Sequence, residues 1–287
     1  MVLNKILQKA SKEHWAVGHF NVSNLEQLKA VVEAAQDSKA PVMIGTSEGE
    51  RAWLGLAEIV ALINAERKNW PYIFLNADHT KSVEAAKAAA DAGYDAIHFD
   101  GSALSLEKNI KSTQEIASYC KNINLNISVE GELGYLKGES QLTDKKVEIG
   151  PNDYTDPDQA REFVGSTGID RLAIAVGNIH GINLEEPRLD FERIKKIREA
   201  VSPDTVLVLH AGSGIADEDI RRAIENGMAN IHISTELRVA FRKGLEDSLK
   251  QNPNEYSPYK LDQKAVEDMK KIVMSKIQLF GAANKSN

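Results

Sequence analysis

The chain has almost no cysteine, no excess of positive charge and no long hydrophobic run. Its single cysteine among 287 residues, Cys120, excludes an internal disulfide, so a reducing cytoplasm is the compartment that we expect. Lys and Arg number 35 against 42 Asp and Glu, which argues against nucleic acid or a membrane as a partner. No apolar stretch reaches the roughly 18 residues that span a bilayer, and a signal-peptide core is lacking. We therefore expect a soluble, unexported protein.

Short apolar or β-branched runs recur along the whole chain, with helical patterns between them. The eight runs are Ala16–Val22, Pro41–Thr46, Tyr72–Asn76, Ala96–Phe99, Ile127–Leu133, Leu172–Val176, Val206–Leu209 and Ile231–Ile233. Eight strands with interleaved helices in about 250 residues are typical of a (β/α)8 TIM barrel, in which the chemistry lies on the loops after the strands. A doubly wound open sheet is the alternative fold.

The residues after the last run predict a C-terminal helical extension. We expect one domain over residues 1–287, with the barrel at about 1–235 and the extension at about 236–287. The extension contains a helical stretch at Glu236–Lys250, a turn at Asn252–Pro258 and an amphipathic helix from Gln263 to Phe280. We expect these helices to pack outside the barrel and to be candidates for the interface of a homodimer or homotetramer.

The segment Gly134–Pro157 is polar and longer than a typical loop between a strand and a helix. We interpret it as a candidate mobile lid or substrate loop. An inert surface excursion is the alternative.

Three of the runs, the third, sixth and seventh, are followed at once or within a few residues by a histidine. These histidines are His79, His180 and His210. In a parallel barrel the carboxyl ends of the strands meet at one mouth, so three imidazoles would converge there, as in a catalytic zinc site. A structural hydrogen-bonding role is the alternative for any one of them. His98 lies inside a predicted strand and is expected to be structural.

Carboxylates accompany the histidines at the same edge. Asp78 precedes His79, Asp100 ends the fourth run, and Glu130 and Glu132 alternate so that both point to one face. Acidic side chains that point into a barrel are costly unless they meet a cation or an acid–base task. A divalent metal would explain them, and a hydrogen-bonded structural network is the alternative.

The turn Ala211-Gly212-Ser213-Gly214 after the seventh run has the small residues of an anion-binding turn, and Ser234-Thr235 adds hydroxyl groups. Phosphate sites recur after strands seven and eight of this fold, although a purely structural turn is the alternative. A metal, an adjacent acid and a phosphate cradle together suggest polarisation of a phosphorylated ketone with proton transfer at carbon.

Eight motifs occur in order across nearly the whole chain. They are Phe20-Asn21-Val22, Thr46-Ser47-Glu48-Gly49, Asp78-His79, Phe99-Asp100-Gly101-Ser102, Glu130-Gly131-Glu132-Leu133-Gly134, Gly177-Asn178-Ile179-His180-Gly181, Leu209-His210-Ala211-Gly212-Ser213-Gly214 and Thr235-Glu236-Leu237. Together they resemble the class II, metal-dependent fructose-bisphosphate and tagatose-bisphosphate aldolases.

The resemblance implies a catalytic zinc ion held by His79, His180 and His210. It also implies that Asp100 and Glu132 serve a second or alternative divalent metal site, and that a monovalent cation assists. Under the resemblance, Asp78 exchanges a proton with the oxygen at the cleaved bond, while Asn21 and Ser47 line the aldehyde end. The phosphate of dihydroxyacetone phosphate is then expected against Gly181, Ala211, Gly212, Ser213, Ser234 and Thr235.

Several positions depart from the family pattern. Ala211 stands where the family usually has a second glycine, and His232 stands where it has an asparagine that touches the bound ketone. At the position of Ser234 the family often has an aspartate or asparagine. A Tyr-Lys pair reads Asn183-Leu184, and the arginine expected near Pro258 for the second phosphate is not apparent. The usual Gly-Gly-x-Glu of the loop reads Lys137-Gly138-Glu139-Ser140, which leaves Glu139 as the candidate that abstracts the proton from carbon.

The expected function is that of a zinc-dependent aldolase, a carbon–carbon lyase. It would reversibly cleave fructose 1,6-bisphosphate to dihydroxyacetone phosphate and glyceraldehyde 3-phosphate in glycolysis or gluconeogenesis. Tagatose 1,6-bisphosphate, or a sugar-acid or deoxy-sugar monophosphate, is the alternative substrate. An inactive barrel that acts as a regulatory or assembly subunit is the alternative of another class.

Overall fold

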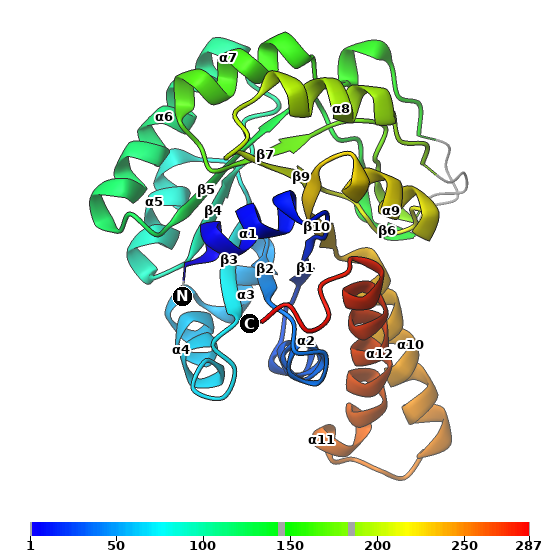
Figure 1. Cartoon of the computed structure of the whole chain (residues 1–287). Coiled ribbons are helices and arrows are strands. Elements are labelled where there is room, and N and C mark those ends of the chain that lie inside the picture. Colours follow the sequence, from blue (N-terminus) through cyan, green and yellow to red (C-terminus); the bar gives the residue numbers. More distant parts are fainter. Residues whose placement is uncertain (1, 143–146, 183–186, 287) are drawn as a thin grey trace.

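The computed structural model describes residues 2–142, 147–182 and 187–286. Within them, eight parallel strands close into a barrel in the order β1-β10-β9-β7-β5-β4-β3-β2 (Figure 1). The strands are β1 (Val17–Asn21), β2 (Val42–Thr46), β3 (Ile73–Thr80), β4 (Ala96–Phe99), β5 (Ser128–Leu133), β7 (Arg171–Ile174), β9 (Val206–Leu209) and β10 (Met228–Ile233). The predicted (β/α)8 barrel is confirmed, and the doubly wound open sheet is wrong. β3 continues beyond its expected end, through Asp78 and His79 to Thr80.

Helices surround the barrel on the outside, except for the first helix, Leu3–Lys12, which lies across one end of the barrel and contacts β9 and β10 (Figure 1). The helices are α1 (Leu3–Lys12), α2 (Leu25–Asp37), α3 (Glu48–Leu54), α4 (Leu56–Glu66), α5 (Val83–Ala92), α6 (Leu106–Ile123), α7 (Pro157–Thr167), α8 (Phe191–Ala200) and α9 (Asp217–Glu225). In α2 the side chain of Asn24 caps the first turn by accepting a hydrogen bond from the backbone N–H of Gln27. Leu28, Val31 and Val32 then recur at helical spacing on its buried face. The apolar core therefore forms between the strands and this outer layer of helices.

The inside of the barrel is polar. Side chains of alternate residues point into a barrel, and nine of the polar or charged residues on its strands have an exposed fraction of 0%. Six of these nine contact one another across the barrel: His19, Asn76, His98, Glu130, Arg171 and Asn230. Hydrogen bonds and ion pairs join all six of them to other strands, so the interior is a connected polar network.

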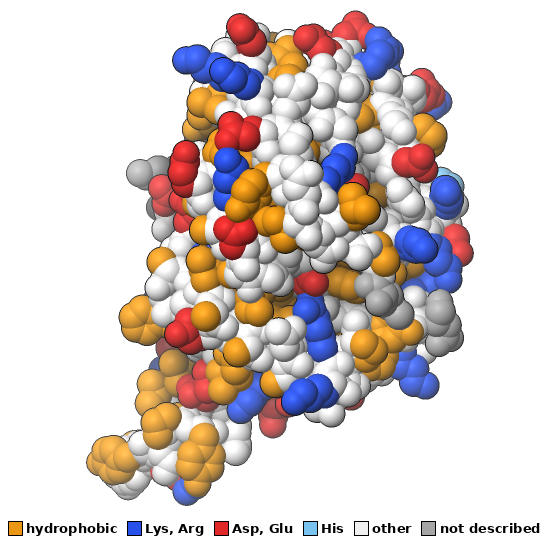
Figure 2. All heavy atoms as spheres, turned by 90° about the vertical axis from the view of Figure 1, so that its left-hand side faces the viewer, with side chains coloured by type: hydrophobic (Ala, Val, Ile, Leu, Met, Phe, Trp, Pro, Cys, Tyr) orange, Lys and Arg blue, Asp and Glu red, His pale blue; other side chains and the backbone are white. Residues whose placement is uncertain are grey.

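The C-terminal extension consists of two long helices and a short one, and it projects from the barrel. α10 (Thr235–Gln251) leads outward, α11 (Pro258–Leu261) lies at the tip, and α12 (Gln263–Leu279) returns and packs on α10 and α2 (Figure 1). The tip stands out at the lower left of Figure 2, and Tyr256 and Tyr259 near it are 84% and 69% exposed. On the face in Figure 2, acidic and basic side chains are interspersed. None of the helices in the described residues is long and apolar enough to cross a membrane.

The long segment after β5 forms a second, smaller sheet at the edge of the barrel. Its strand β6 (Gly138–Leu142) pairs in parallel with β8 (His180–Ile182), and a 3₁₀ helix, η1 (Pro151–Asp153), follows. Residues 143–146 of this segment lie outside the described residues. Thr155 anchors the C-terminal end of this segment to the barrel. Its backbone N–H donates to the carbonyl of Ala175, and its hydroxyl donates to the carbonyl of Leu133.

Candidate active site

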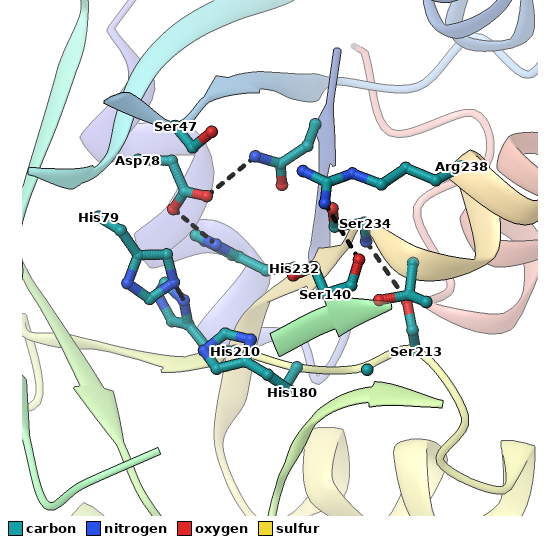
Figure 3. Close-up of a pocket in the computed structure, with 14 residues that line it drawn as sticks. Ser47, Asp78, His79, Ser140, His180, His210, Ser213, His232, Ser234 and Arg238 are labelled. Carbon is teal, nitrogen blue, oxygen red and sulfur yellow. Dashed lines mark hydrogen bonds and ion pairs between the residues drawn. The ribbon is translucent and has the colours of Figure 1, made fainter. Parts of the chain in front are cut away.

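A pocket with an empty volume of about 430 Å³ opens at the carboxyl ends of the barrel strands (Figure 3). Twelve of the residues singled out in the sequence line it: Asn21, Ser47, Asp78, His79, His180, Gly181, His210, Ala211, Ser213, His232, Ser234 and Thr235. Asp100, Glu132 and Glu139 line a neighbouring pocket, which shares His79 and His180 with the first. Gly212 is buried behind the first pocket, and its backbone N–H donates to the carbonyl of His232 at 2.9 Å. The barrel therefore brings the predicted residues to one mouth.

The three histidines at the strand ends converge on one side of this pocket (Figure 3). Nε2 of His79 and Nδ1 of His210 are 3.1 Å apart, and the rings of His79 and His180 are 5.1 Å apart between centroids. His79 has a φ of 44°, in the left-handed region that residues other than glycine rarely adopt. This conformation coincides with a register irregularity between β3 and β4. The backbone thus bends where it presents the first imidazole.

These imidazoles fit a zinc ion. Two nitrogens bound to one tetrahedral zinc at about 2.0–2.1 Å are about 3.3 Å apart, close to the distance between His79 and His210. A metal binds the neutral form of histidine. Burial and the charge of His79 lower the pKa of His180 to about 4, and burial together with His98 and His79 holds the pKa of His210 well below its ordinary value. Both rings are therefore neutral near pH 7. Burial of His79 is instead outweighed by Asp78 and the hydrogen bond with Asp100, which raise the pKa of His79, so this ring must lose its proton when a metal binds.

Asp100 and Glu132 lie behind His79. An oxygen of Asp100 is 3.1 Å from Nδ1 of His79, and one of Glu132 is 3.8 Å from the same nitrogen. Burial raises the pKa of Asp100, but the hydrogen bond from His79 and the charges of His98 and His79 overcome it, so the pKa is well below its ordinary value. The ligand atoms of His79, Asp100 and Glu132 lie within 4.8 Å of one another, so they could also hold a second cation.

His98 lies fully buried beneath the predicted ligands. Its Nδ1 accepts a hydrogen bond from the backbone N–H of His79 at 3.0 Å, and its Nε2 lies 3.0 Å from an oxygen of Glu132. The ring therefore supports the bent backbone at His79 from below.

Asp78 is a buried carboxylate held from several sides. Nδ2 of Asn21 donates to its Oδ2 at 3.0 Å, and Nδ1 of His232 is 3.5 Å from its Oδ1 (Figure 3). The guanidinium of Arg51 donates to its backbone carbonyl at 3.1 Å. Burial raises the pKa of Asp78, but the charge of His79 and the nearby rings of His232 and His98 hold the pKa well below its ordinary value. The side chain is therefore ionised next to the three imidazoles.

Asn21 and Ser47 are fixed by Glu50, a residue that the sequence analysis did not single out. Ser47 caps α3, because its hydroxyl accepts from the backbone N–H of Glu50 while the Glu50 carboxylate accepts from that of Ser47. The same carboxylate accepts a hydrogen bond from Asn21 at 3.1 Å. The capping signal Ser-x-x-Glu was present in the sequence, and it could have identified Glu50.

His232 lies between two other imidazoles. Its ring stacks on His19 at 3.6 Å between centroids and lies 3.9 Å from the ring of His210. Burial and the neighbouring ring of His210 lower the pKa of His232 to about 3, so the ring is neutral. A flat neutral side chain thus forms the wall of the pocket between Asp78 and His210.

The turn after β9 and the start of α10 form the opposite side of the pocket. The hydroxyl of Ser213 accepts from the backbone N–H groups of Ser234 and Glu236, both at 3.3 Å. The hydroxyl oxygen of Ser234 is buried and has no hydrogen-bond partner among the residues that the structure describes, and Ser234 makes no side-chain cap on α10 there. Hydroxyl and backbone N–H groups at the start of a long helix fit a phosphate group.

Arg238 also lines the pocket and was missed in the sequence. It lies one helical turn after Ser234 on α10, a spacing that places both on the same side of the helix. Its guanidinium donates to Glu50 Oε1 at 2.7 Å and to the carbonyl of Ser140 at 3.1 Å. Pro258, where the second-phosphate arginine was sought, begins α11 at the far tip of the extension (Figure 1).

Glu139 lies on β6, exposed to solvent and directed to the neighbouring pocket. Its carboxylate accepts a hydrogen bond from Gln141. β6 packs tightly on Gly181, where an added β-carbon would lie 2.5 Å from the carbonyl oxygens of Glu139 and Gln141. A residue larger than glycine would therefore separate β6 from β8. Asn183 and Leu184 lie outside the described residues.

Ala211 has a φ of 57°, in the left-handed region. That conformation costs an L-residue about 1–2 kcal/mol, more than the roughly 0.5–1 kcal/mol of chain entropy that a glycine loses on folding. Ala211→Gly should therefore raise the free energy of unfolding by about 0–1 kcal/mol, measured by urea denaturation. Ala173→Gly, in the buried strand β7, is the matched control. It should lower the free energy of unfolding by roughly 1 kcal/mol. An equal loss in both variants would contradict the strain at Ala211.

Comparisons with known proteins agree with this geometry. A family model described as fructose-bisphosphate aldolase class-II matches residues 1–285. A fructose-bisphosphate aldolase of Geobacillus stearothermophilus is 35% identical over 99% of this chain and 98% of its own length. The crystal structure of the YdjI aldolase from Escherichia coli K12 has a TM-score of 0.84 at 33% identity, with both chains covered completely. That of a putative fructose-1,6-bisphosphate aldolase from Coccidioides immitis has a TM-score of 0.83 at 27% identity, with 99% of this chain and 97% of that chain covered. The chain belongs to the class II fructose-bisphosphate aldolase family.

Proposed function

We propose that the protein is a zinc-dependent aldolase that reversibly cleaves fructose 1,6-bisphosphate to dihydroxyacetone phosphate and glyceraldehyde 3-phosphate. The convergence of His79, His180 and His210 beside an ionised Asp78 is the observation that carries the proposal. The three imidazoles would hold the zinc ion. When bound, the ion supplies a Lewis acid for the ketone of the substrate and for the charge left on it when the carbon–carbon bond breaks.

Asp78 performs the proton transfer at oxygen. In the cleavage direction its carboxylate accepts the proton of the hydroxyl group whose carbon becomes the aldehyde. The lowered pKa keeps this side chain in the form that can accept a proton. The hydrogen bond from Asn21 fixes the orientation of the carboxylate. Ser47, held by its cap on α3, lines the pocket near the aldehyde end.

The phosphate next to the ketone binds at Gly181, at the turn from Ala211 to Ser213, and at Ser234 and Thr235. The unpartnered hydroxyl of Ser234 and the start of α10 support this assignment. Arg238 is the candidate for the distal phosphate, because it is a cation that lines both pockets. A chain with a formal charge of −7 needs such local cations for a substrate with two phosphates.

Glu139 exchanges the proton at carbon in this proposal. It would protonate the three-carbon ketone fragment after cleavage and abstract the same proton in the reverse reaction. Its place on β6, next to the strand that carries His180, supports the assignment. Asp100 and Glu132 would serve a second divalent metal, and a monovalent cation would assist. The enzyme would act in the cytoplasm, in glycolysis or gluconeogenesis, as a homodimer or homotetramer.

Tagatose 1,6-bisphosphate or another ketose phosphate is the second candidate substrate. The ring of His232 favours it, because this neutral wall between Asp78 and His210 stands where the family contacts the ketone through an asparagine. This candidate leaves the mechanism unchanged and alters only the sugar that fits.

Purified enzyme should be compared on fructose 1,6-bisphosphate, tagatose 1,6-bisphosphate and ketose monophosphates. The proposal expects kcat/KM to be highest for fructose 1,6-bisphosphate, by roughly 10-fold or more over its epimer, as expected for a site that hydrogen-bonds a particular hydroxyl. Triose release can be followed with a coupled dehydrogenase assay. A higher value for tagatose bisphosphate or for a monophosphate would overturn the assignment of the substrate.

Removal of the metal should abolish cleavage. The enzyme dialysed against a strong chelator should lose activity and regain it with zinc, because the chain would supply no other Lewis acid at the ketone. Borohydride added with substrate should not inactivate the enzyme, since no Schiff base forms. Full activity of the metal-free protein, or covalent trapping by borohydride, would refute the mechanism.

Asp78→Ala should lower kcat by roughly 100-fold or more while one zinc ion per chain remains bound. Asp78→Asn is the matched variant, because it keeps the volume of the side chain and removes the proton acceptor. It should lose about as much activity. Turnover near that of the wild type in Asp78→Asn would rule out proton transfer by Asp78, and metal analysis of both variants checks that zinc is retained.

A further inference from the structure

Arg171, at the start of β7, is a cation inside the barrel. Its exposed fraction is 0%, and its guanidinium reaches residues of three other strands. Nε donates to Ser128 on β5 at 3.0 Å, and NH2 donates to the amide oxygen of Asn76 on β3 at 3.0 Å. NH1 donates to the amide oxygen of Asn230 on β10 at 3.2 Å. A guanidinium held by several strands of one closed barrel has a fixed position.

The two amides that accept from Arg171 are themselves held. The side-chain nitrogen of Asn76 lies 3.1 Å from Nε2 of His19. The side-chain nitrogen of Asn230 donates a hydrogen bond to the carbonyl of Val17 at 2.9 Å. Their oxygens are thereby turned toward the guanidinium. The polar layer around Arg171 is therefore an organised cradle for this one side chain.

Glu130 joins this cradle to the site. It has an exposed fraction of 0%, its Oε2 forms an ion pair with NH1 of Arg171, and its Oε1 lies 2.6 Å from Nε2 of His210. A buried carboxylate needs a cation, and Arg171 supplies one. A carboxylate that accepts from one ring nitrogen of a histidine fixes its tautomer and leaves the other nitrogen free to bind a metal. For His210 that other nitrogen is Nδ1, which lies 3.1 Å from Nε2 of His79.

We propose that Arg171 is a positioning residue for the metal. Through Glu130 it holds His210 in the tautomer that carries its proton on Nε2 and directs Nδ1 to the ion. This inference rests on the proposed function only in that it assumes a metal at the three histidines. Arg171 touches neither the substrate nor the metal. Its effect passes along one line of contacts, from the centre of the barrel to the mouth.

The test uses zinc affinity and a spectroscopic signature in the full-length enzyme. Arg171→Met should lower the affinity for zinc by about 10–100-fold, measured by competition with a chelating dye. In the wild type, ¹⁵N chemical shifts of the His210 ring should report a protonated Nε2, with and without zinc. In Arg171→Met this signature should weaken. Arg171→Lys keeps the charge but not the forked geometry, and it should recover part of the affinity.

A matched control separates this role from general stability. Arg67 pairs with Asp95 and donates to the carbonyl of Ile73 at the opposite end of the barrel. Arg67→Met should lower stability without changing zinc affinity or the shifts of His210. Glu130→Gln should lower zinc affinity as Arg171→Met does, and the double variant should lose little more than the worse single variant.

The inference is overturned if Arg171→Met keeps the zinc affinity of the wild type and the same His210 tautomer. It is also overturned if the losses of zinc affinity are additive in the double variant. If Arg171→Met does not fold, Arg171→Lys and Glu130→Gln decide in the same way. Neither readout requires turnover. Failure of the inference is therefore distinct from failure of the proposed function, which would appear as zinc-loaded wild type that cleaves no ketose phosphate.

Discussion

The parallel pairing of β1 with β10, which closes the barrel, is the constraint on which the rest of the structure depends. It places Asn21, near the beginning of the chain, next to the strand that leads into Ser234 and α10. Because all eight strands run in the same direction, every carboxyl end faces one opening. A buried carboxylate from β3, an amide from β1 and the candidate phosphate cradle after β9 and β10 thus share one pocket, although long stretches of chain separate them.

The polar interior of the barrel below that pocket is the second feature that fixes the geometry of the site. Asp78, Glu130 and Glu132 are buried carboxylates, and each would be expensive to ionise alone in a medium of low polarity. Arg171 and the surrounding imidazoles offset part of their charge. The same side chains also fix the orientation of the histidines above them. Charge balance and geometry are therefore supplied by one network, which explains why the inside of this barrel is not filled by aliphatic side chains alone.

The sequence predicted the barrel and the convergence of the histidines, because strands leave periodic apolar runs and a parallel barrel fixes where their ends meet. It did not predict Arg171, which lies just before the predicted run Leu172–Val176, since burial of a guanidinium depends on partners from three other strands. Arg238 was missed because one of several basic residues on a predicted surface helix looks like an ordinary solvent-exposed residue. The exposure of Glu139 was not foreseen either. It follows from the pairing of β6 with β8, which is a contact distant in sequence and without a periodic signal.

That pairing has a consequence for motion. The strand that carries Glu139 and the strand that begins with His180 are joined along their backbones, and the N–H of His180 donates to the carbonyl of Lys137 at 2.9 Å. A displacement of β6 away from the barrel must break these bonds or pull His180 with it. β6 is therefore mechanically coupled to His180, one of the predicted metal ligands. In the proposed mechanism, any motion that carries Glu139 away with β6 would therefore also displace His180.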